Sequence, residues 1–86
     1  MPTVFLVPAG SDSADGASAG DYLLRPKGDD LYEVGKVDDG CTWVGTLSAS
    51  LLPSLPTVDG PQEAPEQTTV LAAVQGVESA EENRGG

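Results

Sequence analysis

Two runs of alternating apolar and polar residues surround the tripeptide Asp38-Asp39-Gly40 near the middle of the chain. Residues 31–37 enter this tripeptide and residues 41–47 leave it, and both runs contain β-branched and aromatic side chains. Asp-Gly between two such runs is the strongest short-range signal of a β-hairpin. The pattern therefore predicts a hairpin that holds the only tryptophan and the only cysteine of the chain.

A tight turn with Asp39 and Gly40 at its centre sets the register of this hairpin. The cross-strand pairs would then be Lys36 with Trp43, Val34 with Gly45, and Tyr32 with Leu47. One face would carry the candidate core of Tyr32, Val34, Cys41, Trp43 and Leu47, and the other would carry Glu33, Val37, Thr42, Val44 and Thr46. The stem of Lys36 would lie across the indole, a cation–π contact of about 0.5–1 kcal/mol. A bulged turn shifted by one residue would instead put Glu33 on the face of Trp43, and we favour the first register because a slip moves the apolar set off the core side.

Shorter strands are predicted before the hairpin. Residues 3–7 form a compact apolar run that ends at Pro8, and residues 22–25 form a second one. Residues 26–30 contain a proline and a glycine, which is typical of a turn. Strands at 22–25, 31–37 and 41–47 would form a three-stranded antiparallel meander, while residues 9–20, rich in Ala, Gly, Ser and Asp, would form a flexible loop.

The second half of the chain has a different character. Four prolines in residues 53–66 predict an extended arm with no regular ladder. Four apolar residues in or beside it are too hydrophobic for a free linker, so that they either cover the meander or contact another chain: Leu51, Leu52, Leu55 and Val58. Residues 68–77 fit either a helix or a closing strand, and Ala72, Ala73 and Gln75 favour a helix that stops near Gly76.

These elements predict one small domain over residues 1–77, either all-β or a β-dominated α+β fold. Its core would be residues 20–52, with the flexible loop 9–20, the proline-rich arm 53–66 and room for a short C-terminal helix. Residues 78–86 would form a disordered acidic tail.

The composition limits how large a core this chain can build. It has 86 residues, of which 38% are hydrophobic and 5% aromatic. A chain of this size buries only roughly 60–65% of its unfolded surface, so its stability is marginal. We therefore expect a partner or self-association to complete the folded state.

The charge balance excludes several partners. Four basic and 14 acidic residues give a net charge of −10. Nucleic acid and anionic membrane surfaces both require clusters of Lys and Arg, which are absent from the sequence. The acidity itself favours solubility, or adaptation to high salt, over docking on a basic surface.

Few residues are equipped for catalysis or for cofactor binding. There is no histidine, which removes the usual general base and most transition-metal sites. Cys41 has no partner for an internal disulfide and is expected to be a small buried hydrophobe. The carboxylate pairs Asp29-Asp30 and Asp38-Asp39 are typical of solvated turns, and the acidic loop at 12–16 lacks the ligand spacing of a calcium loop. The sequence therefore predicts no enzyme, no cofactor and no metal.

The chain ends in Arg84-Gly85-Gly86. This exposed diglycine resembles the ends of ubiquitin-like modifiers and of the β-grasp sulfur carriers. The resemblance covers these three residues and implies activation of the Gly86 carboxylate by an enzyme. A single Arg-Gly-Gly in an acidic chain does not predict RNA binding.

The function that these observations favour is a non-enzymatic structural or interaction subunit. We expect it to dock on a larger protein scaffold, or on copies of itself, through six residues: Leu51, Leu52, Leu55, Val58, Trp43 and Tyr32. Small accessory proteins of virus capsids offer an analogy of type. Residues 1–8 lack the positive charge and the length of a signal peptide, so the predicted location is the cytoplasm or a virion.

Overall fold

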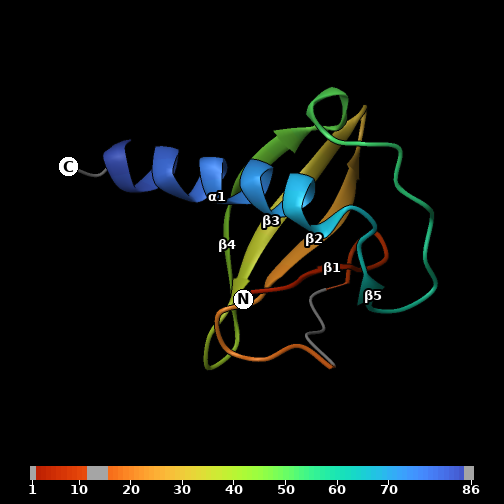
Figure 1. Cartoon of the computed structure of the whole chain (residues 1–86), viewed down its shortest axis with the longest axis horizontal. Helices are drawn as coiled ribbons and strands as arrows, with labels where there is room; N and C mark the ends of the chain where they lie inside the picture. Colours follow the sequence, from red (N-terminus) through yellow and green to blue (C-terminus); the bar gives the residue numbers. More distant parts are fainter. Residues whose placement is uncertain (1, 12–15, 85–86) are drawn as a thin grey trace.

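The computed structural model describes residues 2–11 and 16–84, the last three of these as backbone only. Within these residues, five strands form one mixed sheet in the order β4-β3-β2-β1-β5, and helix α1 lies across one of its faces (Figure 1). The elements are β1 (Val4–Leu6), β2 (Tyr22–Gly28), β3 (Leu31–Val37), β4 (Cys41–Ser48), the 3-10 helix η1 (Ala49–Leu51), β5 (Gln62–Glu63) and α1 (Gln67–Arg84). This β-dominated α+β fold confirms the predicted fold class.

The three-stranded meander is present, and its first strand is longer than predicted. β2 continues through Pro26 to Gly28, so the predicted turn at 26–30 shrinks to Asp29 and Asp30. Both aspartates have positive φ angles, 50° and 62°, which aspartate tolerates better than most residues. The backbone N–H positions of Tyr22, Leu24 and Pro26 lie on the side of β2 that faces β1. The pairing with β1 ends at Leu24, so no strand requires the N–H that Pro26 lacks.

The register of the hairpin is correct at one end and wrong at the other. Val34 pairs with Gly45 as predicted, but Gly35 pairs with Trp43, which leaves Val44 as the extra residue of a β-bulge. The predicted pair of Lys36 with Trp43 is therefore wrong, since Lys36 pairs with Thr42. The bulge also corrects the predicted faces, because Cys41 and Trp43 lie on the face opposite Tyr32, and Val44 joins the face of Tyr32.

The N-terminal strand and the proline-rich arm complete the other side of the sheet. β1 runs parallel to β2, with Val4 opposite Tyr22, which makes the sheet mixed instead of purely antiparallel. The arm returns along β1, and β5 pairs with it through Glu63 opposite Phe5. The expectation of an arm without any ladder is thus corrected to an arm that ends in a two-residue strand.

Helix α1 begins close to its predicted start and runs past its predicted end. Its first residue, Gln67, holds β1 through its side-chain amide, which accepts from the Val4 N–H at 2.9 Å and donates to the Val4 and Ala64 carbonyls at 2.8 Å. The helix continues through Gly76 to Arg84, so the predicted stop at Gly76 is wrong, and residues 78–84 are helical where disorder was expected.

Two apolar clusters stabilise the fold, one on each face of the sheet. The larger cluster lies between the sheet and α1, and its fully buried members come from β1, β2, β3 and the helix: Val4, Leu24, Val34, Val70 and Val74. The smaller cluster lies on the opposite face and contains Val7, Leu23 and Val37, flanked by Phe5, Ala17, Cys41 and Trp43. No helix in the described part of the chain is long and apolar enough to cross a membrane.

Candidate interaction surface

The six residues predicted to contact a partner fall into three places in the structure. Tyr32, Leu52, Leu55 and Val58 are partly buried and pack against the larger core. Trp43 is half-buried on the opposite face of the sheet. Leu51 is 67% exposed at the end of η1, the most exposed large hydrophobic side chain of the described residues. The arm residues therefore cover the protein's own sheet, and Leu51 is left facing solvent.

On the face opposite the helix, Trp43 belongs to a compact polar and aromatic stack. The guanidinium of Arg25 lies 3.7 Å from the centre of the indole ring, so Arg25 provides the cation–π contact that was predicted for Lys36. Arg25 also donates from Nε to Glu33 at 2.8 Å and from Nη1 to the Ser11 carbonyl at 2.8 Å. The hydrogen bond from Arg25 lowers the pKa of Glu33 below its ordinary value. These contacts fix the indole in place over its own sheet.

Leu51 borders an apolar groove between β4 and α1, which we call the edge groove. Its strand side is formed by Thr46, Leu47, Ser48 and Leu51, and its helix side by Ala72, Ala73, Gly76, Val77 and Ala80. The groove has a volume of about 480 Å³. Most of its helix side is alanine and glycine, which leaves space that larger side chains would fill. The edge groove is thus an apolar hollow at the rim of the sheet, beside an exposed leucine.

The approach of α1 to β4 depends on a glycine. A Cβ atom on Gly45 would lie 2.7 Å from Cγ1 of Val77, closer than real contacts allow. Without that atom, the helix can cross β4 in direct contact with the strand. Gly45 therefore sets the distance between the two walls of the edge groove.

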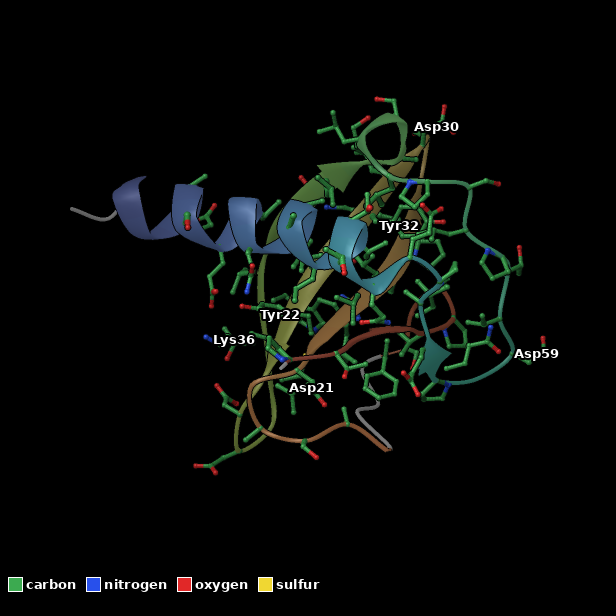
Figure 2. The ribbon with its side chains drawn as sticks, viewed as in Figure 1. Asp21, Tyr22, Asp30, Tyr32, Lys36 and Asp59 are labelled. Carbon is green, nitrogen blue, oxygen red and sulfur yellow. The ribbon has the colours of Figure 1, made fainter. Side chains whose placement is uncertain are left out.

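The C-terminal half of α1 is anchored to the sheet by a polar network beside the groove. Tyr22 donates its hydroxyl to Glu78 at 2.7 Å, and Lys36 forms an ion pair with the other oxygen of Glu78 at 2.7 Å. Figure 2 shows Tyr22 and Lys36 next to each other beneath the helix. The bonds from Lys36 and Tyr22 lower the pKa of Glu78, whereas burial and the bond to Glu78 raise the pKa of Tyr22. The network holds the helix in one position over the sheet.

A second hollow lies beneath the proline-rich arm. It has a volume of about 390 Å³ and is lined by Tyr32, Leu24 and Val58, together with prolines of three separate segments. Its walls are mostly apolar, and residues of the arm line it. This hollow offers a small apolar cavity, whereas the edge groove opens at the rim of the sheet.

Other candidate chemistry is not assembled within the described residues. They contain no group of three or more metal-ligating side chains, and they have no buried polar side-chain atom without a hydrogen-bond partner. Most of the predicted acidic loop at 12–16, and the diglycine Gly85-Gly86, lie outside the described residues. α1 runs to Arg84, so the diglycine follows a helix, whereas in the ubiquitin-like families it follows the last strand of the sheet.

Comparisons of this chain with protein-family models, with curated proteins and with solved structures found no match.

Sequence reasoning identified Leu51 but missed the groove beside it. The helix side has a signal in the sequence, because Ala72, Gly76 and Ala80 recur every four residues and share one side of a helix. The predicted helix stop near Gly76 placed Ala80 outside the helix, so this spacing was missed. The strand side has no comparable signal, since the groove arises only when α1 crosses β4.

Proposed function

We propose that this chain is a non-enzymatic interaction subunit that docks on a larger protein assembly through the edge groove. The single observation that carries the proposal is Leu51, exposed at 67% on the rim of an apolar groove of about 480 Å³. A single exposed leucine is ordinary on a protein surface, but one that continues an apolar hollow is typical of a contact site. The groove residues thus supply both a projecting anchor and a receiving surface.

The rest of the fold supports the choice of this surface over the arm. The arm residues Leu52, Leu55 and Val58 already pack against the larger core, so their apolar area is partly used within the chain. Trp43 is covered by Arg25 on one side of its ring. Within the described residues, no side chain covers the edge groove in either of these ways. A partner that filled the groove would enlarge the small apolar core of this chain.

The test is the size of the complex that the tagged chain forms in the cells that produce it. We expect the wild-type chain to migrate in gel filtration with an assembly far larger than a single chain. The variant Leu51→Asp places a charge in the groove and should move the chain to the monomer position. Leu31→Asp is the matched control, since Leu31 is 37% exposed and does not line the groove.

The control variant should stay in the large complex. A wild-type chain that migrates alone, or a Leu51→Asp variant that remains in the complex, would contradict docking through this groove. Circular dichroism of both purified variants checks that neither substitution unfolds the chain.

A further inference from the structure

The two edges of the sheet differ in how they are protected. Exposed edge strands pair with other chains unless they are short, charged, interrupted by proline or covered. β5 has two residues, one of them Glu63, and Pro61 and Pro65 lie close to its ends. β4 has eight residues, none charged and none proline, and its only irregularity is the bulge at Val44. In the described part of the chain, no element pairs with the outer side of β4.

The C-terminal part of β4 directs backbone groups toward this free edge. Ala49 donates its N–H to the Asp30 carbonyl at 2.7 Å, so the residue after β4 faces inward, toward the β2–β3 turn. Backbone groups of successive strand residues point to opposite sides of the strand. Thr46 therefore directs its N–H and C=O groups outward, along the same stretch of β4 that lines the edge groove. Ser48 directs its N–H outward as well, whereas its C=O begins η1, of which Ser48 is the N-cap.

Helix α1 continues over the space next to this edge. The helix crosses β4 where Val77 contacts Gly45, and its C-terminal end then projects beyond the strand (Figure 1). A strand added to β4 would lie below this projecting end. Because alternate side chains of a strand point to one face, every second residue of the added strand would point toward α1 and the edge groove.

We infer that the partner contributes an extended segment that pairs with β4 as a sixth strand and inserts apolar side chains into the edge groove. The inference rests on the proposed function and specifies how the partner is bound. Main-chain hydrogen bonds to Thr46 and Ser48 would supply affinity, and the groove would select alternate apolar residues, as in other cases of strand addition.

The charges favour a basic segment over a second copy of this chain. Asp38 and Asp39 precede β4, Asp30 lies beside its end, and the whole chain carries a net charge of −10. Two copies joined edge to edge would bring these carboxylates together, and like charges across an interface oppose association. A partner segment with lysine or arginine at the positions that point away from α1 complements them.

A synthetic peptide tests the mode of binding without knowledge of the natural partner. The probe alternates lysine and valine over about eight residues, the length of β4, and is acetylated and amidated at its ends. In ¹⁵N-labelled protein we expect saturable shifts of the amides of residues 43–48 and 72–80. N-methylation of every second peptide residue, on the side that faces β4, should weaken binding roughly tenfold or more, which is about 1.4 kcal/mol.

One further probe and two variants complete the experiment. A peptide with glutamate in place of lysine should bind at least tenfold more weakly at low salt. Thr46→Pro removes an outward N–H from β4 and should abolish the shifts, while Leu31→Ala, which changes no charge, should leave them unchanged. If Thr46→Pro unfolds the chain, the N-methylated peptide gives the same test on the wild-type protein.

Four results would overturn the inference. The N-methylated peptide binding as tightly as the parent would show docking by side chains alone, as would shifts confined to α1. Shifts at the hollow beneath the arm would place the segment elsewhere. Dimerisation of the protein through β4, detected by light scattering, would identify a second copy as the occupant. None of these results would change whether the chain migrates in a large complex, so the proposed function fails or stands separately.

Discussion

Gly35 lies beneath the indole of Trp43. The close fit between them explains why Trp43 lies on the face opposite α1 and not on the predicted face with Tyr32. A Cβ atom on Gly35 would lie 2.8 Å from the Trp43 ring and 2.8 Å from Sγ of Cys41. The bulge at Val44 turns the indole onto this glycine while Val44 and Leu47 remain under α1. Arg25 then covers the outer side of the ring. A glycine in a strand thus marks a close approach by a neighbouring side chain.

We predict that Gly35→Ala lowers the free energy of unfolding by about 1–3 kcal/mol, the usual cost of forcing an extra methyl into a packed site. Urea titration followed by Trp43 fluorescence measures the change and also reports movement of the indole. The control is Gly40→Ala, where an added Cβ meets nothing within 4 Å, and we expect a change smaller than 0.5 kcal/mol in size. Equal effects at the two glycines would contradict the packing of Trp43 on Gly35.

Glu78 is the second residue on which local structure depends, because it joins α1 to both β2 and β3. Its pKa is lowered below the ordinary value of 4.5, first by the bond from Lys36 and then by the bond from Tyr22. The folded state therefore binds the proton on Glu78 less tightly than the unfolded state does. The stability that Glu78 contributes is fully present above pH 4.5 and is lost as the pH falls through its lowered pKa.

We predict that Glu78→Gln costs up to about 1 kcal/mol of unfolding free energy at pH 7, a modest value because the ion pair is partly exposed. The difference between variant and wild type should shrink as the pH falls below 4.5. Chemical denaturation at a series of pH values measures it. Asp59→Asn is the control, since Asp59 is exposed on the outer side of the arm (Figure 2). A difference that stays constant down to the acid transition would contradict the role of the charged carboxylate.

At the scale of elements, local sequence patterns predicted correctly those strands and turns that are determined by residues close together in the chain. The hairpin at Asp38-Asp39-Gly40 and the meander are present because turn chemistry and alternation act over a few residues. The position of Trp43 was wrong because the bulge depends on packing of β4 between α1 and the opposite face. The parallel β1–β2 pair and the β5 ladder join segments far apart in sequence, so no local pattern indicates them.

The C-terminal end of α1 was also predicted wrongly, because it depends on tertiary contacts. Gly76 was interpreted as a stop, but tertiary contacts on either side of it hold the helix together, with Val74 buried before it and Glu78 bonded to Tyr22 after it. Packing thus overrides the low helix propensity of glycine. For the candidate site, sequence reasoning selected Leu51 only as one of four apolar residues in or beside the arm. The edge groove depends on the close approach of Gly45 and Val77, which no local pattern indicates.

We predict that Gly76→Ala stabilises the protein by about 0.5–1 kcal/mol, because it removes backbone freedom from the unfolded chain at a helical position. An added Cβ on Gly76 meets nothing within 4 Å, so no clash offsets the gain. Gly45→Ala is the contrasting variant, since its Cβ would meet Val77, and it should destabilise. Thermal unfolding by circular dichroism measures both, and a loss of stability in Gly76→Ala would contradict a helix that continues through Gly76.

At the scale of the whole molecule, the net charge of −10 acts against the folded state. Compaction brings like charges together, and salt screens their repulsion within a Debye length of about 10 Å at 0.1 M. The ion pairs of Arg25 with Glu33 and of Lys36 with Glu78 are weakened by the same screening. The chain has 14 acidic residues against four basic ones, so repulsion among the carboxylates dominates the response to salt.

We therefore predict that the thermal midpoint rises by roughly 4–8 °C between low and moderate NaCl concentration, which corresponds to about 1 kcal/mol for a domain of this size. The matched variant replaces three exposed carboxylates that form no ion pair within the described residues: Asp29→Asn, Asp39→Asn and Asp59→Asn. It should be more stable than the wild type at low salt and should respond less to added NaCl. A midpoint that falls with salt would mean that attraction between opposite charges outweighs the repulsion. In that case the acidity would not destabilise the isolated chain, and the electrostatic argument for a basic partner at β4 would lose its support.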